Sequence, residues 1–90
     1  MPYRIVLSRS ATKELAGLPN KIHDKVVERL RKLETEPRGR GCEKLSGLEA
    51  YKLRIRDLRI VFEIHDKARE VRIVMVDDRK QVYKRLRRKS

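Results

Sequence analysis

The sequence of 90 residues carries 25 Lys and Arg against 13 Asp and Glu, which gives a formal net charge of +12. A chain of this length forms one small domain, residues 1–90, and buries only about 60% of the surface that its unfolded form exposes. The excess charge favours nucleic acid or an acidic protein segment as partner. An apolar run of roughly 20 residues and a secretory signal are both lacking, so we expect a cytoplasmic protein without a membrane partner.

The first half of the chain predicts a strand and two helices. Residues 3–7, YRIVL, are rich in β-branched side chains and predict a strand. Ser8 or Ser10 can cap the helix that follows, and Pro19 starts a second helix because its fixed φ suits the first turn. One side of the second helix is apolar, through Ile22, Val26, Leu30 and Leu33. The short connection between the two helices makes them a hairpin.

The second half predicts three strands and a last helix. Residues 50–56, 58–64 and 71–76 alternate or are uniformly apolar, and their connections are so short that neighbouring strands must be antiparallel. Asp78 is a candidate N-cap with Gln81 three residues on, so a short C-terminal helix is expected. The order β-α-α-β-β-β-α predicts an α+β fold, in which the helical hairpin covers one face of an antiparallel sheet.

The strand residues divide into an apolar face and a basic face. The helices need an apolar surface to pack on, and one register of residues 51–62 supplies it. The other register, which we expect on the uncovered face, carries Lys52, Arg54, Arg56, Arg59 and Arg72. A face that is charged only for solubility would mix signs, but Glu63 is the only acid among these positions. The patch therefore favours a phosphate-backbone site.

Two residues of the tail could join this patch. Arg79 and Tyr83 are four positions apart on the expected last helix and so share one side of it. The spacing leaves a second interpretation open, in which the Tyr83 ring packs against the sheet and Arg79 pairs with Asp77 or Asp78.

The order of these segments resembles a known family. The run YKLRIRDLRIVF, residues 51–62, followed by DRKQVY, residues 78–83, is similar to the RelE branch of the RelE/ParE superfamily of bacterial and archaeal toxins. The amino-terminal strand and helices, with Leu-Pro between the helices, fit the same family. The resemblance therefore covers nearly the whole chain.

The resemblance implies a function and a set of site residues. RelE-type toxins are ribosome-dependent endoribonucleases that cut mRNA in the A site and are silenced by an antitoxin. We therefore expect mRNA on the ribosome as substrate and an acidic, RelB-like antitoxin as partner. From the resemblance we expect five residues to be catalytic: Lys52, Arg54, Arg59, Arg79 and Tyr83.

Internal cleavage of RNA by these residues needs no metal and no cofactor. The ribose 2′-OH attacks its own phosphodiester when its proton is removed and the phosphorane and leaving oxygen are stabilised. Lys52 is the candidate base because neighbouring cations favour its neutral form, while the planar guanidinium groups of Arg54 and Arg59 would hold the phosphate. Arg79 would neutralise charge at the leaving group. Tyr83 would stack on or orient a base, or assist proton transfer.

Other reactive side chains have no part in this prediction. Cys42 is the only cysteine, which excludes an internal disulfide and a Cys-rich zinc site. His23 and His65 fall on the second helix and in a turn, and we expect both at the surface.

The sequence leaves two other functions open. A ParE-like poison of DNA gyrase has the same fold. ParE-type members, however, generally lack the combination of an Arg and a Tyr near the end of the chain, which Arg79 and Tyr83 provide here. A basic RNA-binding module without toxicity would keep RNA binding after both residues were lost. Asp77 and Asp78 stand where the RelE pattern has Gly and a basic residue. They would either weaken the affinity of the site for an anion or orient Arg79.

Overall fold

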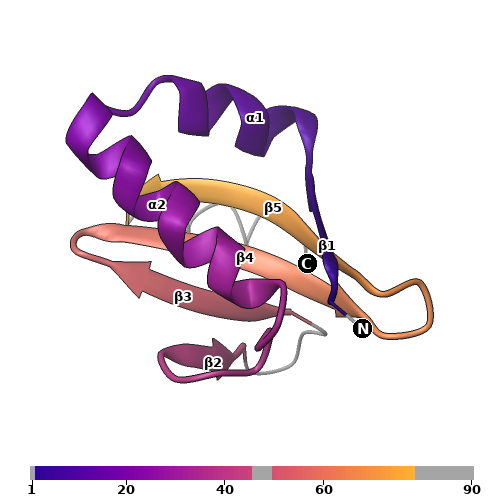
Figure 1. The fold of residues 1–90 in the computed structure, drawn as a ribbon. Coiled ribbons are helices and arrows are strands. Elements are labelled where there is room, and N and C mark those ends of the chain that lie inside the picture. Colours follow the sequence, from indigo (N-terminus) through magenta and orange to yellow (C-terminus); the bar gives the residue numbers. More distant parts are fainter. Residues whose placement is uncertain (1, 46–49, 79–90) are drawn as a thin grey trace.

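The described part of the chain folds into a five-stranded sheet with two helices on one face (Figure 1). The computed structural model describes residues 2–45 and 50–78. The elements are β1 (Arg4–Leu7), α1 (Arg9–Ala16), α2 (Asn20–Leu33), β2 (Cys42–Lys44), β3 (Tyr51–Ile55), β4 (Leu58–His65) and β5 (Glu70–Asp78). The strands lie in the order β1-β5-β4-β3-β2. The predicted α+β class is confirmed, while the predicted C-terminal helix lies outside the described residues.

The sheet is mixed rather than fully antiparallel. β1 runs parallel to β5, with Arg4 opposite Glu70. The pairs β3–β4 and β4–β5 are antiparallel as predicted, and β2 is antiparallel to β3. The short connections that demand antiparallel neighbours join only β3 to β4 and β4 to β5. β1 and β5 are far apart in sequence, so no tight turn constrains their relative direction.

Strand β2 forms one edge of the sheet and is not predicted from the sequence. It has three residues and pairs with β3, with Cys42 opposite Leu53 and Lys44 opposite Tyr51. The strand lies in a connection rich in glycine and is too short to show a period of two. It adds residues to the sheet directly beside the basic positions of β3.

The first helix begins where Ser8 caps it. Ser8 Oγ accepts a hydrogen bond from the Ala11 N–H at 3.0 Å and donates one to Val74 O at 2.8 Å. Ser8 is thus the N-cap, and Ser10 lies inside α1. The second helix begins directly after Pro19, which occupies its N-cap position rather than its first turn. Within the part of the chain that the structure describes, no helix is long and apolar enough to cross a membrane.

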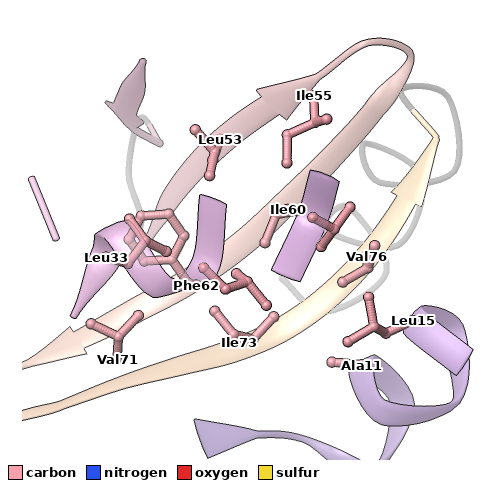
Figure 2. Packing of buried hydrophobic residues seen from close by; sticks show 12 residues of the cluster. Ala11, Leu15, Leu33, Leu53, Ile55, Ile60, Phe62, Val71, Ile73 and Val76 are labelled. Carbon is pink, nitrogen blue, oxygen red and sulfur yellow. The ribbon is translucent and has the colours of Figure 1, made fainter. Parts of the chain in front are cut away.

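The core lies between the helices and the sheet (Figure 2). Phe62 is fully buried, and its ring stacks on the Tyr51 ring with 5.8 Å between centroids. The other buried members of this core are Ala11, Leu15, Val26, Leu30, Leu33, Leu53, Ile55, Ile60, Val71, Ile73 and Val76. The register of residues 51–62 that the sequence assigns to the helices therefore packs against them.

The opposite face of the sheet is not fully uncovered, contrary to the expectation from the sequence. Val61 and Met75 are 1% and 0% exposed, and they form a small cluster with Leu45. The partly buried Ala50 and Val74 pack against this cluster. The basic residues on this face therefore lie beside buried apolar side chains rather than on an open sheet.

A polar network holds the connection between α2 and β2. The Arg38 guanidinium donates two hydrogen bonds to the Asp66 carboxylate, at 3.2 and 3.0 Å, and lies over the Tyr51 ring. The Tyr3 hydroxyl donates to the same carboxylate at 2.6 Å. The hydrogen bonds from Arg38 and Tyr3 hold the pKa of Asp66 below its usual range. This network ties the segment before β2 to the turn between β4 and β5.

Candidate functional site

Three of the predicted site residues come together on the face away from the helices. Lys52 and Arg54 lie on β3 and Arg59 lies on β4, with Arg54 and Arg59 directly opposite each other. Leu53 and Ile55 are buried in the core, so alternation along β3 turns Lys52 and Arg54 to the other face. Three cations are thereby concentrated on two neighbouring strands.

These cations line a small pocket of about 100 Å³. We call it the cationic pocket, and its lining residues are Gly41, Glu43, Lys52, Arg54 and Arg59. Glu43 Oε2 lies 3.6 Å from Lys52 Nζ, and the exposed Arg54 donates from Nε to Arg56 O at 3.2 Å. Three cations face one carboxylate in this pocket, so its surplus positive charge suits a phosphate.

Arg59 is buried, although the sequence places it on an uncovered face. It is 6% exposed, and its Nη1 donates a hydrogen bond to Leu58 O at 3.3 Å. Among the side chains that the structure describes, those of residues 2–45 and 50–77, no carboxylate forms an ion pair with Arg59. Asp77 is its partner in the register of β4 and β5. A buried charge is costly unless it is paired, so the Arg59 guanidinium would gain from an incoming anion.

Arg56 and Arg72, predicted to bind RNA with the other three, lie elsewhere. Arg56 occupies the hairpin turn between β3 and β4, where it is exposed and has a φ of +54°. In the register of β4 and β5, Arg72 lies opposite Glu63, whereas Asp77 lies opposite Arg59. At about 3.4 Å per residue, Arg72 and Asp77 are about 17 Å apart along β5. The alternation of the sequence indicates the face of a residue but not its position along the sheet, so it does not show that Arg56 and Arg72 lie away from the cationic pocket. Their role in RNA binding stays a prediction.

Arg72 belongs instead to a group of ion pairs between β1 and β5. Its Nε and Nη2 each lie 2.9 Å from Glu70 Oε1, and Arg4 pairs with the other carboxylate oxygen. The Glu70 side chain is 11% exposed, and its bonds to Arg4 and Arg72 hold its pKa below the usual range. These contacts stabilise the parallel strand pair.

Two residues of the cationic pocket, Gly41 and Glu43, are not predicted from the sequence. Gly41 directly precedes β2 and Glu43 lies in it, and this strand is too short to be recognised from the alternation of its residues. Gly41 has a φ of +88°, and a Cβ at this position would lie 3.2 Å from Arg29 Nη2. The glycines of this connection are the only signal in the sequence that the backbone approaches another element closely here.

Two of the predicted catalytic residues fall outside the described part of the chain, and both histidines lie outside the cationic pocket. Arg79 and Tyr83 lie outside the described residues. His65 Nε2 is 2.9 Å from Glu63 Oε1, and His23 Nδ1 is 3.5 Å from Asp24 Oδ1. Among the residues that the structure describes, no group of three or more His, Cys, Asp or Glu side chains could hold a metal ion.

The chain matches one family model and several solved structures. Residues 5–83 match the family described as the ParE toxin of type II toxin-antitoxin system, parDE. No curated protein matches the chain.

The similar structures include RelE toxins and their complexes with antitoxins. The toxin–antitoxin complex RelBE2 from Mycobacterium tuberculosis is 28% identical, with a TM-score of 0.76, and the match covers 88% of this chain and 100% of that one. The archaeal RelE–RelB complex from Pyrococcus horikoshii is 26% identical, with a TM-score of 0.74 and coverage of 88% and 97%. A free mutant of the E. coli toxin RelE is 22% identical, with a TM-score of 0.80 and coverage of 93% of both chains.

These matches cover nearly all of the chain and confirm the resemblance that the sequence carries. The match to the ParE model extends from β1 into the last residues of the chain. The chain belongs to the ParE toxin family of the RelE/ParE superfamily and is the toxin of a type II toxin–antitoxin system.

Proposed function

We propose that this toxin is a ribosome-dependent endoribonuclease that cleaves mRNA in the A site and so inhibits translation in the cytoplasm. The cationic pocket carries the proposal. In it the buried Arg59 lies directly opposite Arg54 and has no carboxylate ion pair among the described residues. Like charges in this position repel each other, and a phosphate bound between them would remove that repulsion.

The proposed cleavage uses the pocket to hold the scissile phosphate. Arg54 and Arg59 bind the phosphate oxygens and stabilise the charge that develops in the phosphorane. Lys52 removes the proton from the 2′-OH, whose oxygen forms a bond to phosphorus while the bond from phosphorus to the 5′-oxygen breaks. In the same proposal Arg79 neutralises the leaving oxygen and Tyr83 orients a base.

We also propose an acidic, RelB-like antitoxin as the partner of this chain. The similar structures from M. tuberculosis and P. horikoshii are complexes of a toxin with its antitoxin. A net charge of +12 favours an acidic chain as the silencing partner. Purification together with the product of the neighbouring reading frame should give a complex whose affinity falls with salt. A complex that is insensitive to salt would contradict this part of the proposal.

Poisoning of DNA gyrase is the second candidate function, because the matching family model is that of the ParE toxins. One pair of assays separates the two functions. The purified toxin is added to ribosomes that translate a defined mRNA, and the cut sites are mapped by primer extension. The same preparation is added to gyrase with a relaxed plasmid. If the mRNA is cut at codons in the A site and gyrase supercoils the plasmid normally, the nuclease function is supported. If the mRNA stays intact and gyrase is trapped in complexes with DNA, the toxin is a gyrase poison and the nuclease proposal is wrong.

A further inference from the structure

The segment that leads into β2 contributes to two pockets. Gly41 lines the cationic pocket, and its neighbours Arg40 and Cys42 line a second pocket of about 350 Å³ against α2. We call this the α2 pocket, and the side chains that line it are Arg29, Lys32, Leu33, Glu36, Arg40 and Cys42. Its volume falls within the roughly 300–1,000 Å³ of small-molecule sites.

The α2 pocket carries a surplus of positive charge. Three of its side chains are cations and one, Glu36, is a carboxylate. Within the described ranges none of Arg29, Lys32 and Arg40 forms an ion pair, and Arg29 Nη2 donates to Arg40 O at 3.2 Å. The helix dipole explains a cation in the last turn, as for Lys32. It does not explain Arg29 in an earlier turn or Arg40 outside the helix.

The pocket also has an apolar part. Leu33 is 2% exposed and belongs to the hydrophobic core, while Cys42 is partly buried and packs against that core. Cations beside an apolar surface suit a ligand that joins an anionic group to a flat apolar one. A nucleotide of single-stranded RNA has this character, because its phosphate binds cations and its base packs on apolar or guanidinium surfaces. A lone carboxylate from a peptide would use the cations but leave the apolar part unfilled.

Arg29 connects the two pockets. A Cβ on Gly41, which lines the cationic pocket, would lie 3.2 Å from the Nη2 of Arg29, which lines the α2 pocket. The two sites are therefore adjacent across the backbone of Gly41. We propose that the α2 pocket binds one nucleotide of the RNA strand that flanks the phosphate held in the cationic pocket. This inference rests on the proposed nuclease function.

Cys42 provides a direct test because it is the only cysteine of the chain and lines the α2 pocket. Burial raises the pKa of its thiol, and only the thiolate reacts with iodoacetamide. The rate of alkylation is therefore compared with and without RNA at one fixed pH. The probe is a short single-stranded 2′-O-methyl oligoribonucleotide, which cannot be cleaved by 2′-OH attack. A ligand that fills a pocket loses most of its surface to the protein, so saturating probe should slow the alkylation of Cys42 roughly tenfold in the full-length toxin.

Substitutions on the rim provide the second test. Each of Lys32→Ala and Arg40→Ala should weaken binding of the probe and lower the slope of log affinity against log salt by about 0.7. Arg31→Ala is the matched control, because Arg31 is an exposed cation on the same turn of α2 that lines neither pocket. It should leave both the affinity and the slope near their wild-type values.

Three outcomes would overturn the inference, and they separate it from the proposed function. If the probe binds and Arg54→Ala weakens it, but Cys42 reacts unprotected, the α2 pocket is empty and the nuclease proposal stands. If Lys32→Ala and Arg40→Ala weaken only the complex with the antitoxin, the pocket is an antitoxin site. If the wild-type toxin neither binds the probe nor cuts mRNA, the inference and the proposed function fail together.

Discussion

Arg54 and Arg59 lie directly opposite each other on the antiparallel strands β3 and β4, and both line the cationic pocket. Two like charges in this position destabilise a strand pair, and the burial of Arg59 adds a cost of desolvation. The packing of the domain does not require this pair, because the core residues next to it, Leu53 and Ile60, face the helices. Such a pair is what we expect of residues that bind an anion.

The first prediction sets stability against activity at Arg59. In Arg59→Met the apolar part of the side chain is kept and the repulsion with Arg54 is removed. We expect the free energy of unfolding in urea to stay the same or rise by up to about 1 kcal/mol. Loss of one positioned donor to the phosphate should slow the cleavage of mRNA by about 10²–10³. If stability and activity fell together, Arg59 would be a structural residue.

The second prediction concerns the cap of α1. Ser8→Ala removes the acceptor for the Ala11 N–H and should lower the free energy of unfolding by about 1 kcal/mol. Ser10→Ala is the matched control, because Ser10 is exposed within the helix and alanine is the best helix former. Its stability should equal or exceed that of the wild type. Equal losses in the two variants would show that Ser8 is not the cap.

The third prediction is a dependence of stability on pH through Asp66. Arg38 and Tyr3 lower the pKa of this carboxyl in the folded state, so its contribution is fully present above the unfolded pKa of about 3.9. It is lost as the pH falls through the lower pKa of the folded state. Asp66→Asn should therefore be less stable than the wild type near neutral pH, and the difference should shrink in acid.

The measurement for Asp66 is urea unfolding of both proteins along a series of pH values. Glu70, whose pKa is also lowered by its partners, changes stability in the same direction. Its effect is common to both proteins and cancels in the difference between them. A difference that stays constant down to the most acidic pH would rule out the ionised Asp66 as the source.

The sequence predicts the helix-facing side of the sheet well because that side is decided by local alternation. Tyr51, Leu53 and Ile55 recur at the period of a strand and must be buried, which sends Lys52 and Arg54 to the other face. The same reasoning succeeds for α2, whose apolar residues recur at the period of a helix.

The features that the sequence does not predict depend on distant parts of the chain. Arg72 shares a face with Arg59, but its place along the sheet is set by the register of β4 and β5, which includes a bulge between Val61 and Phe62. The contribution of Glu43 depends on β2, which is a strand only because β3 pairs with it. Neither feature is encoded in the residues around it, so a pattern read along the chain cannot locate them.

We propose that the cationic pocket, rather than the overall charge, makes this toxin a nuclease. The most direct test is single-turnover cleavage of mRNA on programmed ribosomes by Arg54→Ala and by Lys67→Ala. Both variants lose one exposed cation, but Lys67 lies in the turn between β4 and β5 and does not line the pocket. We predict that Arg54→Ala cleaves about 10²–10³ times more slowly than the wild type and that Lys67→Ala cleaves at the wild-type rate. Equal rates for the two variants would contradict the account.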